Sequence, residues 1–464
     1  MALKLYNTLG RKKQVFKPLR DKEVGLYTCG PTVYWFAHIG NLRTYLFGDI
    51  LKRVLVYNGF KVKHVMNITD VGHLTSDAEE GEDKMIKALR REGKPITVEA
   101  VKEVAKFYTD AFLSDLKRLN IILPDVICPA TEHIPEMIEL IKRIEKRGYT
   151  YKTGVGLIYD TSKFKKYAKL GNLNLEQLKA GARVEPDPER RNPSDFALWL
   201  TNQPNQLMQW DSPWGRGFPG WHIECSAMSM KYLGESFDIH CGGEEHVPVH
   251  HTNEIAQSEA ATGKKWVKYW LHARWLLFKG SKMAKSSGEI LTVSELEKKG
   301  YGPVVYRYFT LTAHYRTQLD FTDENIDAAK NAYERLVNRV IELKKENDSK
   351  GDIKEYKKKF LEFINDDLNM PEALSLMWQV LKDDRLGAKE KLELVYNFDN
   401  VFGLGLKELH EHKAPEAVMK LVHEREAARK AKDFKKSDKL REEIRKLGWE
   451  VQDTEEGQKL SKKI

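Results

Sequence analysis

The stretch Phe237–Glu254 reads FDIHCGGEEHVPVHHTNE and holds four histidines and three glutamates within eighteen residues. It begins with an apolar strand end that runs into a Gly-Gly turn. His250 and Glu254 are four positions apart, so a helix that starts near Val249 places both side chains on one face, where they can bind one metal ion. Because a lone His/Glu pair on a polar helix is more often a solvated surface, the pattern gains weight only from its neighbours.

Two cysteines elsewhere in the chain are candidates to complete such a site. Cys225 lies in the segment GWHIECSAM and Cys29 in YTCGPTVY. Two thiolates, an imidazole and a carboxylate suit Zn²⁺, because sulfur and nitrogen donors favour a borderline-soft ion in tetrahedral geometry. The spacing is not that of a compact CxxC…CxxC site, so it is informative only together with the rest of the chain.

Length and composition describe a folded, soluble protein of two to four domains. The chain has 464 residues, of which 41% are hydrophobic. It has no apolar run of the roughly 18 to 20 residues that a membrane span needs, and the N-terminus lacks a signal-peptide core, so we expect a cytoplasmic protein without membrane contact. Four cysteines favour metal binding or burial over a disulfide framework. The net charge of +9 is compatible with a polyanionic partner, although interleaved charges also describe an ordinary surface.

The apolar pattern predicts an α/β fold with a split, Rossmann-like parallel sheet. A buried strand at 25–30, a helix at 42–57 and a strand at 62–68 form a βαβ-like unit. This unit has no GxGxxG sequence, so a dinucleotide-dependent dehydrogenase is disfavoured. Strand signals return at 236–240 and 266–273, on either side of the helix expected to carry the His/Glu pair. We therefore expect the two halves of one sheet to be separated in sequence.

The chain divides into five expected parts. Short strands, turns and the loop PDPERRNPSD lie before residue 195 and suggest an insertion into the first fold, whereas the pattern from about residue 324 onward is consistently helical. The parts are the first half of the core (1–95), the insertion (96–195), the second half of the core (196–278), a connecting region (279–324) and an all-α C-terminal domain (325–464).

One motif at a predicted strand-to-helix junction indicates nucleotide binding. The segment AHIGN, 37–41, places Gly40 where a ligand phosphate can approach the backbone at a helix N-terminus. His38 and Asn41 can donate hydrogen bonds to that phosphate. The plainer alternative is that His38 only caps the helix.

A second motif, KMAKSS at 282–287, follows Gly280. Lys282 and Lys285 with small hydroxylated neighbours make a cationic loop that can close over a triphosphate and neutralise developing charge. Lysine-rich loops are common, so each motif is weak alone. The two together are specific.

In this order, on a split nucleotide-binding fold, the two motifs resemble the HIGH and KMSKS sequences of class I aminoacyl-tRNA synthetases. Within that group the chain resembles the cysteinyl-tRNA synthetase family from end to end, and the ordered matches argue against chance similarity. The matching stretches are YNTLGRKK (6–13), YTCGPTVY (27–34), NITD (67–70), DFALW (195–199), GWHIECSAMS (220–229), FDIH (237–240), HHTNEIAQSEA (250–260) and KDFKKSDKLREEIRKLGWEVQDT (432–454).

The resemblance implies one zinc ion held by Cys29, Cys225, His250 and Glu254, with the sulfur of the substrate cysteine as a further ligand. Zinc favours a thiolate and lowers its pKa, whereas serine is a poor ligand and alanine is none. Discrimination of this kind needs no editing domain, in keeping with the modest insertion. The resemblance also implies that Thr69 binds the amine of L-cysteine, that Trp221 packs against the amino acid and that His240 lies at the floor of the pocket.

For ATP, the resemblance implies phosphate contacts from His38 and Asn41, ribose contacts from Glu245, and stabilisation of the triphosphate in the transition state by Lys285, with Lys282 among the catalytic residues. The implied reaction is in-line attack of the cysteine carboxylate on the α-phosphorus with Mg²⁺ assistance, which releases pyrophosphate. The cysteinyl adenylate then reacts with the terminal ribose of tRNA(Cys). In this reading 279–324 contacts the tRNA stem and 325–464 binds the anticodon region.

Five positions depart from the commonest pattern of the family: Asn41 replaces the second His of HIGH, Ala284 the Ser of KMSKS, Glu245 a shorter Asp, Phe218 a frequent Arg and Cys241 a usual Gly. The Asn41 amide can still donate to phosphate but cannot titrate. Cys241 resembles a zinc ligand by residue type, yet we expect it at a strand end beside the nucleotide rather than beside Cys29.

Other residues of the same types have plainer interpretations. We expect Cys128 to be a buried small hydrophobe. His222, His246 and His251 are expected around the metal site or in solvent, and any of them could replace His250 if the helix register shifts.

These inferences lead to a predicted monomeric, zinc-containing, ATP-dependent cysteine–tRNA ligase. One alternative is a related enzyme that activates cysteine but transfers it to a small amine, which has little use for the helical region 326–464. Another is a zinc-dependent RNA-binding protein with an inactive site, which does not require His38, Lys282 and Lys285.

Overall fold

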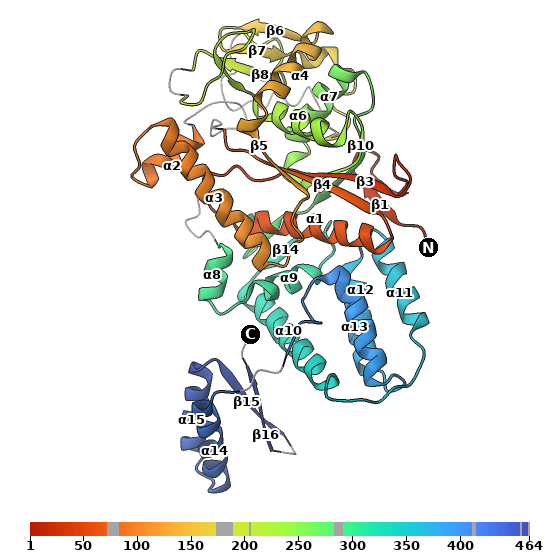
Figure 1. Cartoon of the computed structure of the whole chain (residues 1–464), viewed down its shortest axis with the longest axis vertical. Coiled ribbons are helices and arrows are strands. Elements are labelled where there is room, and N and C mark those ends of the chain that lie inside the picture. The colour runs from red at the N-terminus through yellow and green to blue at the C-terminus, as the bar shows by residue number, and fades with distance from the viewer. Residues whose placement is uncertain are drawn as a thin grey trace.

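The computed structural model describes residues 1–71, 83–172, 189–203, 206–282, 291–410, 414–454 and 457–462. Its centre is a five-stranded sheet in the order β11-β10-β3-β4-β5, in which every neighbouring pair is parallel (Figure 1). The predicted α/β fold with a split parallel sheet is confirmed. Its strands are β3 (Glu23–Thr28), β4 (Lys61–Ile68), β5 (Val126–Pro129), β10 (Phe237–Gly243) and β11 (Val267–Ala273).

The strand order reverses between β3 and β10. Helix α1 (Ile39–Tyr57) connects β3 to β4 on one side, and helix α7 (His250–Thr262) connects β10 to β11 on the other. The register pairs His240 with Tyr27 and Cys241 with Thr28. In open parallel sheets, ligands bind beyond the carboxyl ends of the strands at such a reversal. The chain segments that follow β3 and β10 are therefore the expected walls of a site.

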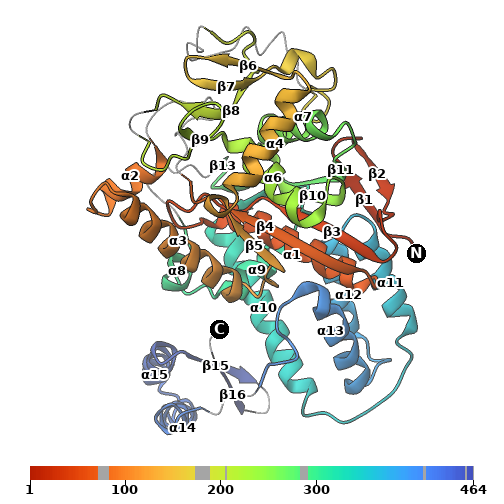
Figure 2. The same cartoon turned by 45° about the horizontal axis from the view of Figure 1, so that its top comes forward.

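Helices cover both faces of the sheet, which explains why its strands are apolar on both sides. Helix α1 lies against one face, and α4 (Ile134–Lys146), α6 (Trp221–Leu233) and α7 lie on the other (Figures 1 and 2). On α1, Leu42, Leu46 and Leu51 are at most 1% exposed. Truncation of such a leucine to alanine costs about 2–5 kcal/mol, so α1 is a main contributor to stability as well as to the site.

The antiparallel sheet above the core in Figure 1 is bounded differently from the expected insertion. Strand β5 falls within 96–195 but belongs to the central sheet, and two of the strands that form the antiparallel sheet follow residue 195. Short strands carry little local information, and their pairing is decided by tertiary partners. The order of this sheet is β6 (Thr150–Thr153), β7 (Gly156–Tyr159), β8 (Phe196–Thr201) and β9 (Gly217–Pro219); helices α2 (Lys84–Arg91) and α3 (Val98–Arg118) precede it.

A small three-stranded sheet leads from the core into the helical region. The order is β13 (Ser281–Lys282), β12 (Leu276–Phe278) and β14 (Leu319–Phe321), with α8 (Val293–Lys298) and α9 (Pro303–Leu311) between β13 and β14. The Tyr306 hydroxyl on α9 donates a 2.6 Å hydrogen bond to the Ile39 carbonyl at the start of α1. This contact fixes α9 against the helix that opens the site.

The C-terminal region is helical as predicted, and it also contains an antiparallel hairpin that the sequence analysis did not predict. The hairpin packs on the last two helices around a separate small core with Val422, Ile444 and Trp449. None of the helices in the described ranges is long and apolar enough to cross a membrane. The remaining elements are β1 (Lys4–Asn7), β2 (Lys12–Val15), α10 (Asp323–Leu343), α11 (Lys354–Asn365), α12 (Met370–Lys382), α13 (Ala388–Phe402), α14 (Glu416–Lys430), α15 (Phe434–Lys446), β15 (Trp449–Thr454) and β16 (Gly457–Lys462), with short 3-10 turns at Ala130–Glu132, Thr161–Lys163 and Glu244–His246.

Candidate functional site

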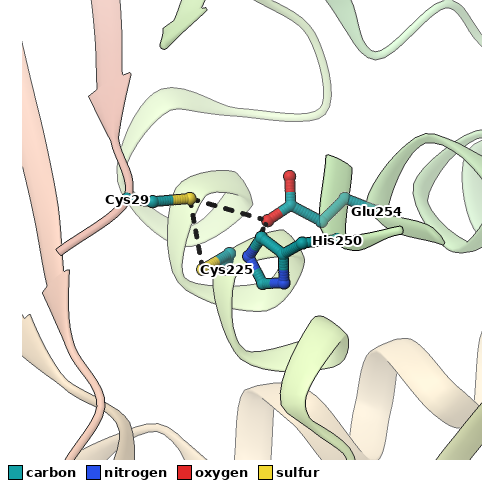
Figure 3. Close-up of side chains that lie close together, drawn as sticks. All are labelled: Cys29, Cys225, His250 and Glu254. Atoms are coloured by element: carbon teal, nitrogen blue, oxygen red, sulfur yellow. Dashed lines mark hydrogen bonds and ion pairs between the residues drawn. The ribbon is translucent and has the colours of Figure 1, made fainter. Parts of the chain in front are cut away.

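Four side chains from three elements converge at the strand reversal (Figure 3). Cys29 follows β3, Cys225 lies in α6, and His250 and Glu254 lie one turn apart at the start of α7. The Cys29 and Cys225 sulfurs are 4.0 Å apart, and Nε2 of His250 is 2.9 Å from Oε1 of Glu254. All four candidate ligand atoms lie within 4.8 Å of one another. The structure therefore brings together the four residues that the sequence analysis named as zinc ligands.

Burial and mutual contacts shift the pKa values of this quartet. Burial raises the pKa of the Cys29 thiol well above its usual value. Burial acts in the same direction on Cys225, but hydrogen bonds with Cys29 and His250 outweigh it and lower the pKa of that thiol. Burial disfavours a charged His250, yet the attraction of Glu254 outweighs burial and raises the His250 pKa to about 10. The protonated His250 thus neutralises a carboxylate that a divalent cation would otherwise neutralise, so metal binding is expected to release protons.

The residues present fit a zinc ion. Cys225, His250 and Glu254 are at most 3% exposed and Cys29 is 6% exposed, and both thiols are free. Oε1 of Glu254 lies 2.9 Å from Nε2 of His250 and 4.0 Å from the Cys29 sulfur, so one carboxylate oxygen faces both of these ligand atoms (Figure 3). Buried charged groups are paired or bind metals, and this donor set is one that zinc accepts.

A second quartet, Cys29, His240, His251 and Glu254, also lies within 4.8 Å. Nε2 of His251 is 3.4 Å from the Cys29 sulfur, so the expectation that another histidine could replace His250 has a structural basis. Two arguments favour the first quartet. It has two thiolates, which zinc prefers, and three of its members line an open cavity that neither His240 nor His251 reaches.

That cavity has a volume of about 200 Å³ and lies beyond the carboxyl ends of β3 and β10. We call Cys29, Cys225, His250 and Glu254 the metal quartet; all but Glu254 line the cavity, together with the start of α1 and aromatic side chains. Seven residues predicted from the sequence line it: Cys29, Asn41, Thr69, Trp221, Cys225, Glu245 and His250. The Trp221 ring lies 4.5 Å from the His250 ring between centroids, so one wall of the cavity is a flat aromatic surface beside the metal quartet.

His38 caps α1, as the plainer sequence interpretation anticipated. Its Nδ1 accepts a 3.1 Å hydrogen bond from the backbone N–H of Asn41. An accepting Nδ1 places the proton of a neutral ring on Nε2. The cap places this Nε2–H at the N-terminal end of α1, where the helix dipole favours anions.

A buried carboxylate beside Thr69 escaped the sequence analysis. Oγ1 of Thr69 donates a 2.8 Å hydrogen bond to Oε2 of Glu224, which is completely buried. Asn67 donates from Nδ2 to the same Thr69 oxygen at 3.2 Å. The signal in the sequence was a charged residue between Ile223 and Cys225 on an otherwise apolar helix face, since buried carboxylates are rare without a partner.

Gly242 and Gly243, expected from the sequence to form a turn, are instead the last two residues of β10, paired with His272 and Ala273, and close packing requires glycine at both positions. A Cβ on Gly242 would lie 2.9 Å from both His246 Nδ1 and His251 Cε1. A Cβ on Gly243 would meet the Glu245 carboxylate at 2.3 Å. Glu245 in turn accepts a 2.9 Å hydrogen bond from Nε1 of Trp275, which holds its carboxylate at the cavity wall. The two glycines let imidazoles and a carboxylate pack directly on the strand backbone.

The remaining predicted residues lie at three kinds of position. His240 is fully buried on β10 behind the metal quartet, 4.6 Å from the Trp270 ring between centroids. Lys282 is in β13, paired with Leu277. Lys285 and the rest of its motif lie outside the described residues.

Cys241 was expected at a strand end beside the nucleotide rather than beside Cys29, but it does not line the cavity, and its carbonyl accepts a 3.4 Å hydrogen bond from the Cys29 N–H. Its side chain is 1% exposed, packs in the hydrophobic cluster that contains α1 and belongs to neither metal-capable quartet. Cys128 is a buried thiol in β5, and its sulfur lies 3.4 Å from the Met66 carbonyl. Neither is a candidate ligand in the described structure.

Comparisons with known proteins agree along the whole length of the chain. Residues 15–331 match the family described as the tRNA synthetase class I (C) catalytic domain, and residues 411–459 match the cysteinyl-tRNA ligase anticodon-binding domain. A cysteine–tRNA ligase of Treponema denticola is 48% identical, with 98% of each chain covered. One from Thermococcus gammatolerans is 43% identical, again with 98% of each chain covered. The matched residues include both the central sheet and the C-terminal helices.

Among solved structures, the chain is similar in fold to Mycobacterium tuberculosis methionyl-tRNA synthetase bound to methionyl-adenylate. The TM-score is 0.54 at 15% sequence identity, with 83% of this chain and 90% of that chain covered. A second structure of that synthetase gives a TM-score of 0.55 with the same coverage. At this identity the likeness concerns the fold alone.

Proposed function

The chain belongs to the cysteine–tRNA ligase family of class I aminoacyl-tRNA synthetases, and from this premise we propose that it activates L-cysteine with ATP and transfers it to the 3′-terminal adenosine of tRNA(Cys). The observation that carries the proposal is that three features border one cavity. Two sulfurs and an imidazole of the metal quartet, the capped start of α1 and Thr69 all face the same space or border it. Such a space suits a small thiol substrate held beside a nucleotide.

Selection of cysteine is proposed to rest on the metal quartet. Cys29, Cys225, His250 and Glu254 would hold one Zn²⁺ ion, which when bound supplies a Lewis-acidic position that favours a thiolate over the hydroxyl of serine. Trp221 would pack on the substrate backbone. Thr69 would contact the substrate ammonium, with the buried Glu224 carboxylate behind it as a fixed negative charge.

ATP is proposed to lie across the start of α1. Nε2–H of His38, the side-chain amide of Asn41 and the positive end of the α1 dipole would attract its phosphates, and Glu245 would accept hydrogen bonds from the ribose hydroxyls. Lys282 and Lys285 would neutralise the triphosphate together with Mg²⁺ as the charge redistributes. In-line attack of the cysteine carboxylate on the α-phosphorus would then release pyrophosphate, through positioning and charge stabilisation rather than a covalent enzyme intermediate.

The test measures two activities in order. Pyrophosphate exchange into ATP is assayed with cysteine and with serine, and charging of a tRNA(Cys) transcript is then assayed with cysteine. Exchange with cysteine alone, followed by charging, is the expected result. Exchange without charging would favour the enzyme that transfers cysteine to a small amine, and tRNA binding without exchange would favour an RNA-binding protein with an inactive site.

The finer assignments belong to the same proposal. The region 279–324 would contact the tRNA stem and the region 325–464 would bind the anticodon arm, the part of the chain in which the anticodon-binding family matches. The monomeric state and the cytoplasmic location stay predictions from the sequence. Size-exclusion chromatography with light scattering tests the first.

A further inference from the structure

A layer of aromatic side chains runs from the cavity wall to the molecular surface. Trp35 and Phe36 line the cavity, and Phe36 meets the rings of Phe107 and Tyr108 on α3 at centroid distances of 5.9 and 5.0 Å. The Arg91 guanidinium of α2 lies 3.3 Å from the centroid of the Trp35 ring and 5.7 Å from that of Tyr108. We call these five residues the aromatic layer.

The outer part of the aromatic layer is open to solvent. Phe36 is 37% exposed and Phe107 is 55% exposed, while Tyr108 beneath them is buried. A single exposed phenylalanine is ordinary on a protein surface. Two adjacent rings in contact with each other, and continuous with a cavity, form a patch that is available to a ligand with a flat apolar face.

Polar contacts hold Arg91 and Tyr108 in the inner part of the layer. Nη2 of Arg91 donates hydrogen bonds to the Tyr34 carbonyl at 2.7 Å and to the Tyr108 hydroxyl at 3.0 Å. The Tyr108 hydroxyl donates to Glu92 at 2.5 Å. The guanidinium plane and the Tyr108 ring, on which Phe36 packs, are therefore oriented before any ligand arrives, which lowers the entropic cost of binding.

We propose that the aromatic layer stacks the unpaired bases at the 3′ end of the tRNA, next to the terminal adenosine that enters the cavity. This inference rests on the proposed function. Unpaired nucleotides bind proteins by stacking on aromatic rings and guanidinium planes, a mode that tolerates any base because every base has a π-face. The layer offers both kinds of surface in contact with one another.

The position of the aromatic layer beside the cavity and the charge of helix α2 both favour the 3′ end of the tRNA as the ligand. Under the proposed function, cysteine, ATP and then the terminal adenosine use the cavity, so the nucleotides before the terminal one have to lie outside it. The layer is the surface that continues from the cavity at Trp35 and Phe36. Helix α2, which supplies Arg91, has the sequence KMIKALRR, with four basic and no acidic residues, and is suited to the phosphates between the stacked bases.

Phe107 is the residue on which to test the layer, because it does not line the cavity and its ring is the most exposed of the five. The variants are Phe107→Ala, which removes the ring, Phe107→Leu, which keeps apolar bulk without a π-face, and Phe107→Tyr, which keeps the ring. Each is assayed for cysteine-dependent pyrophosphate exchange, which needs no tRNA, and for charging of tRNA(Cys) with separate KM and kcat. A tRNA with 2-aminopurine at the base next to the terminal adenosine reports stacking directly.

We expect exchange to be unchanged in all three variants. Charging should fall by roughly five- to 150-fold in kcat/KM for Phe107→Ala and Phe107→Leu and should be retained in Phe107→Tyr, since a stacked base contributes about 1–3 kcal/mol. The 2-aminopurine fluorescence should be quenched by the wild type and by Phe107→Tyr only. A tRNA that lacks its unpaired 3′ nucleotides should bind the wild type and Phe107→Ala equally.

Three outcomes overturn the inference. If Phe107→Ala charges tRNA and quenches 2-aminopurine like the wild type, the layer does not hold the 3′ end, while the proposed function stands. If exchange falls together with charging, the ring supports the adenylate pocket or the fold instead. If the wild type itself shows no cysteine-dependent exchange, the proposed function fails, and the inference fails with it.

Discussion

The Thr69 hydroxyl donates a 2.8 Å hydrogen bond to a carboxylate, Glu224, that has no exposure to solvent. The two residues are 155 positions apart, one just after β4 and the other on α6 next to Cys225. Under the proposed function, the Glu224 carboxylate behind the Thr69 hydroxyl would help to bind the substrate ammonium, beside the metal quartet that would bind the thiol.

Glu224→Gln should raise the KM for cysteine in pyrophosphate exchange about tenfold with a smaller change in kcat, because a charge-assisted contact is worth about 1.5–3 kcal/mol. The glutamine amide oxygen can still accept the Thr69 hydrogen bond, so the fold should be retained. Glu235→Gln is the control, since Glu235 pairs with Lys264 and Arg143 at the surface near the end of α6. An unchanged KM in Glu224→Gln would exclude a role for this charge in binding cysteine.

Cys225→Ala should reduce bound zinc, measured by atomic emission on purified protein, from about one ion per chain to near zero. Cysteine-dependent exchange should fall with it by at least about a hundredfold. Mutation of a residue that only hydrogen-bonds to a metal ligand already lowers metal affinity or activity about 10–100-fold. Cys128→Ala removes a buried thiol that lies outside the quartet and should keep both zinc and exchange. Exchange that survives zinc loss would mean that specificity resides in Thr69, Trp221 and His240 instead.

His38→Asn separates the two roles of this residue. Asparagine is a good helix N-cap, so the Asn41 N–H should keep an acceptor and the melting temperature should stay within a few degrees of the wild type. The Nε2–H donor is lost, and kcat for exchange should fall about 10²–10³-fold, as for other donors to developing charge. A variant with normal exchange would mean that His38 serves only as a cap.

Gly242→Ala should disturb the site without a change in charge. The new Cβ would lie 2.9 Å from His246 Nδ1 and His251 Cε1, so both rings have to shift. We expect lower zinc occupancy and at least about a tenfold loss of exchange activity. A displacement of catalytic groups by about 1 Å can lower a reaction rate by about a hundredfold. Gly302→Ala is the matched control, because a Cβ there meets nothing within 4 Å.

Arg307→Leu should destabilise the junction between α1 and the helical region. Arg307 and Asp49 form an ion pair whose side chains have no exposure to solvent. Nε of Arg307 also donates a hydrogen bond to the carbonyl of Phe402, the last residue of α13. The loss of one partner from a buried pair costs about 3–5 kcal/mol in free energy of unfolding, measured by urea denaturation at pH 7. Arg339→Leu breaks an exposed pair with Glu346 and should cost less than about 1 kcal/mol.

The same variant has a predictable pH dependence. Burial would raise the pKa of Asp49, but Arg307 and Arg53 outweigh it and hold that pKa below its usual value of 3.8. A carboxylate with a depressed pKa in the folded state stabilises the protein above its unfolded pKa and loses this contribution as pH falls through the folded value. The stability gap between wild type and Arg307→Leu should therefore be constant near neutral pH and narrow below about pH 4.

Much of the fold could be inferred from local patterns. The strands at β3, β4, β10 and β11 and the long helices appear close to their expected ranges. Two elements did not. The β15–β16 hairpin was missed because its alternation is masked by lysines and glutamates, and β5 was assigned to the insertion because four residues carry too little periodicity to reveal which sheet they join.

The sequence by itself determined that His250 and Glu254 share a helix face, because a spacing of four residues matches the 3.6-residue helical repeat wherever the helix lies. It also determined which residue types were available for a metal and a nucleotide. Only the tertiary structure decided that Cys29 and Cys225 meet at 4.0 Å, that Glu224 backs Thr69, and that His251 forms a competing set with Cys29. These contacts join segments that no local periodicity relates, so they depend on strand order and on how the helices pack across the sheet.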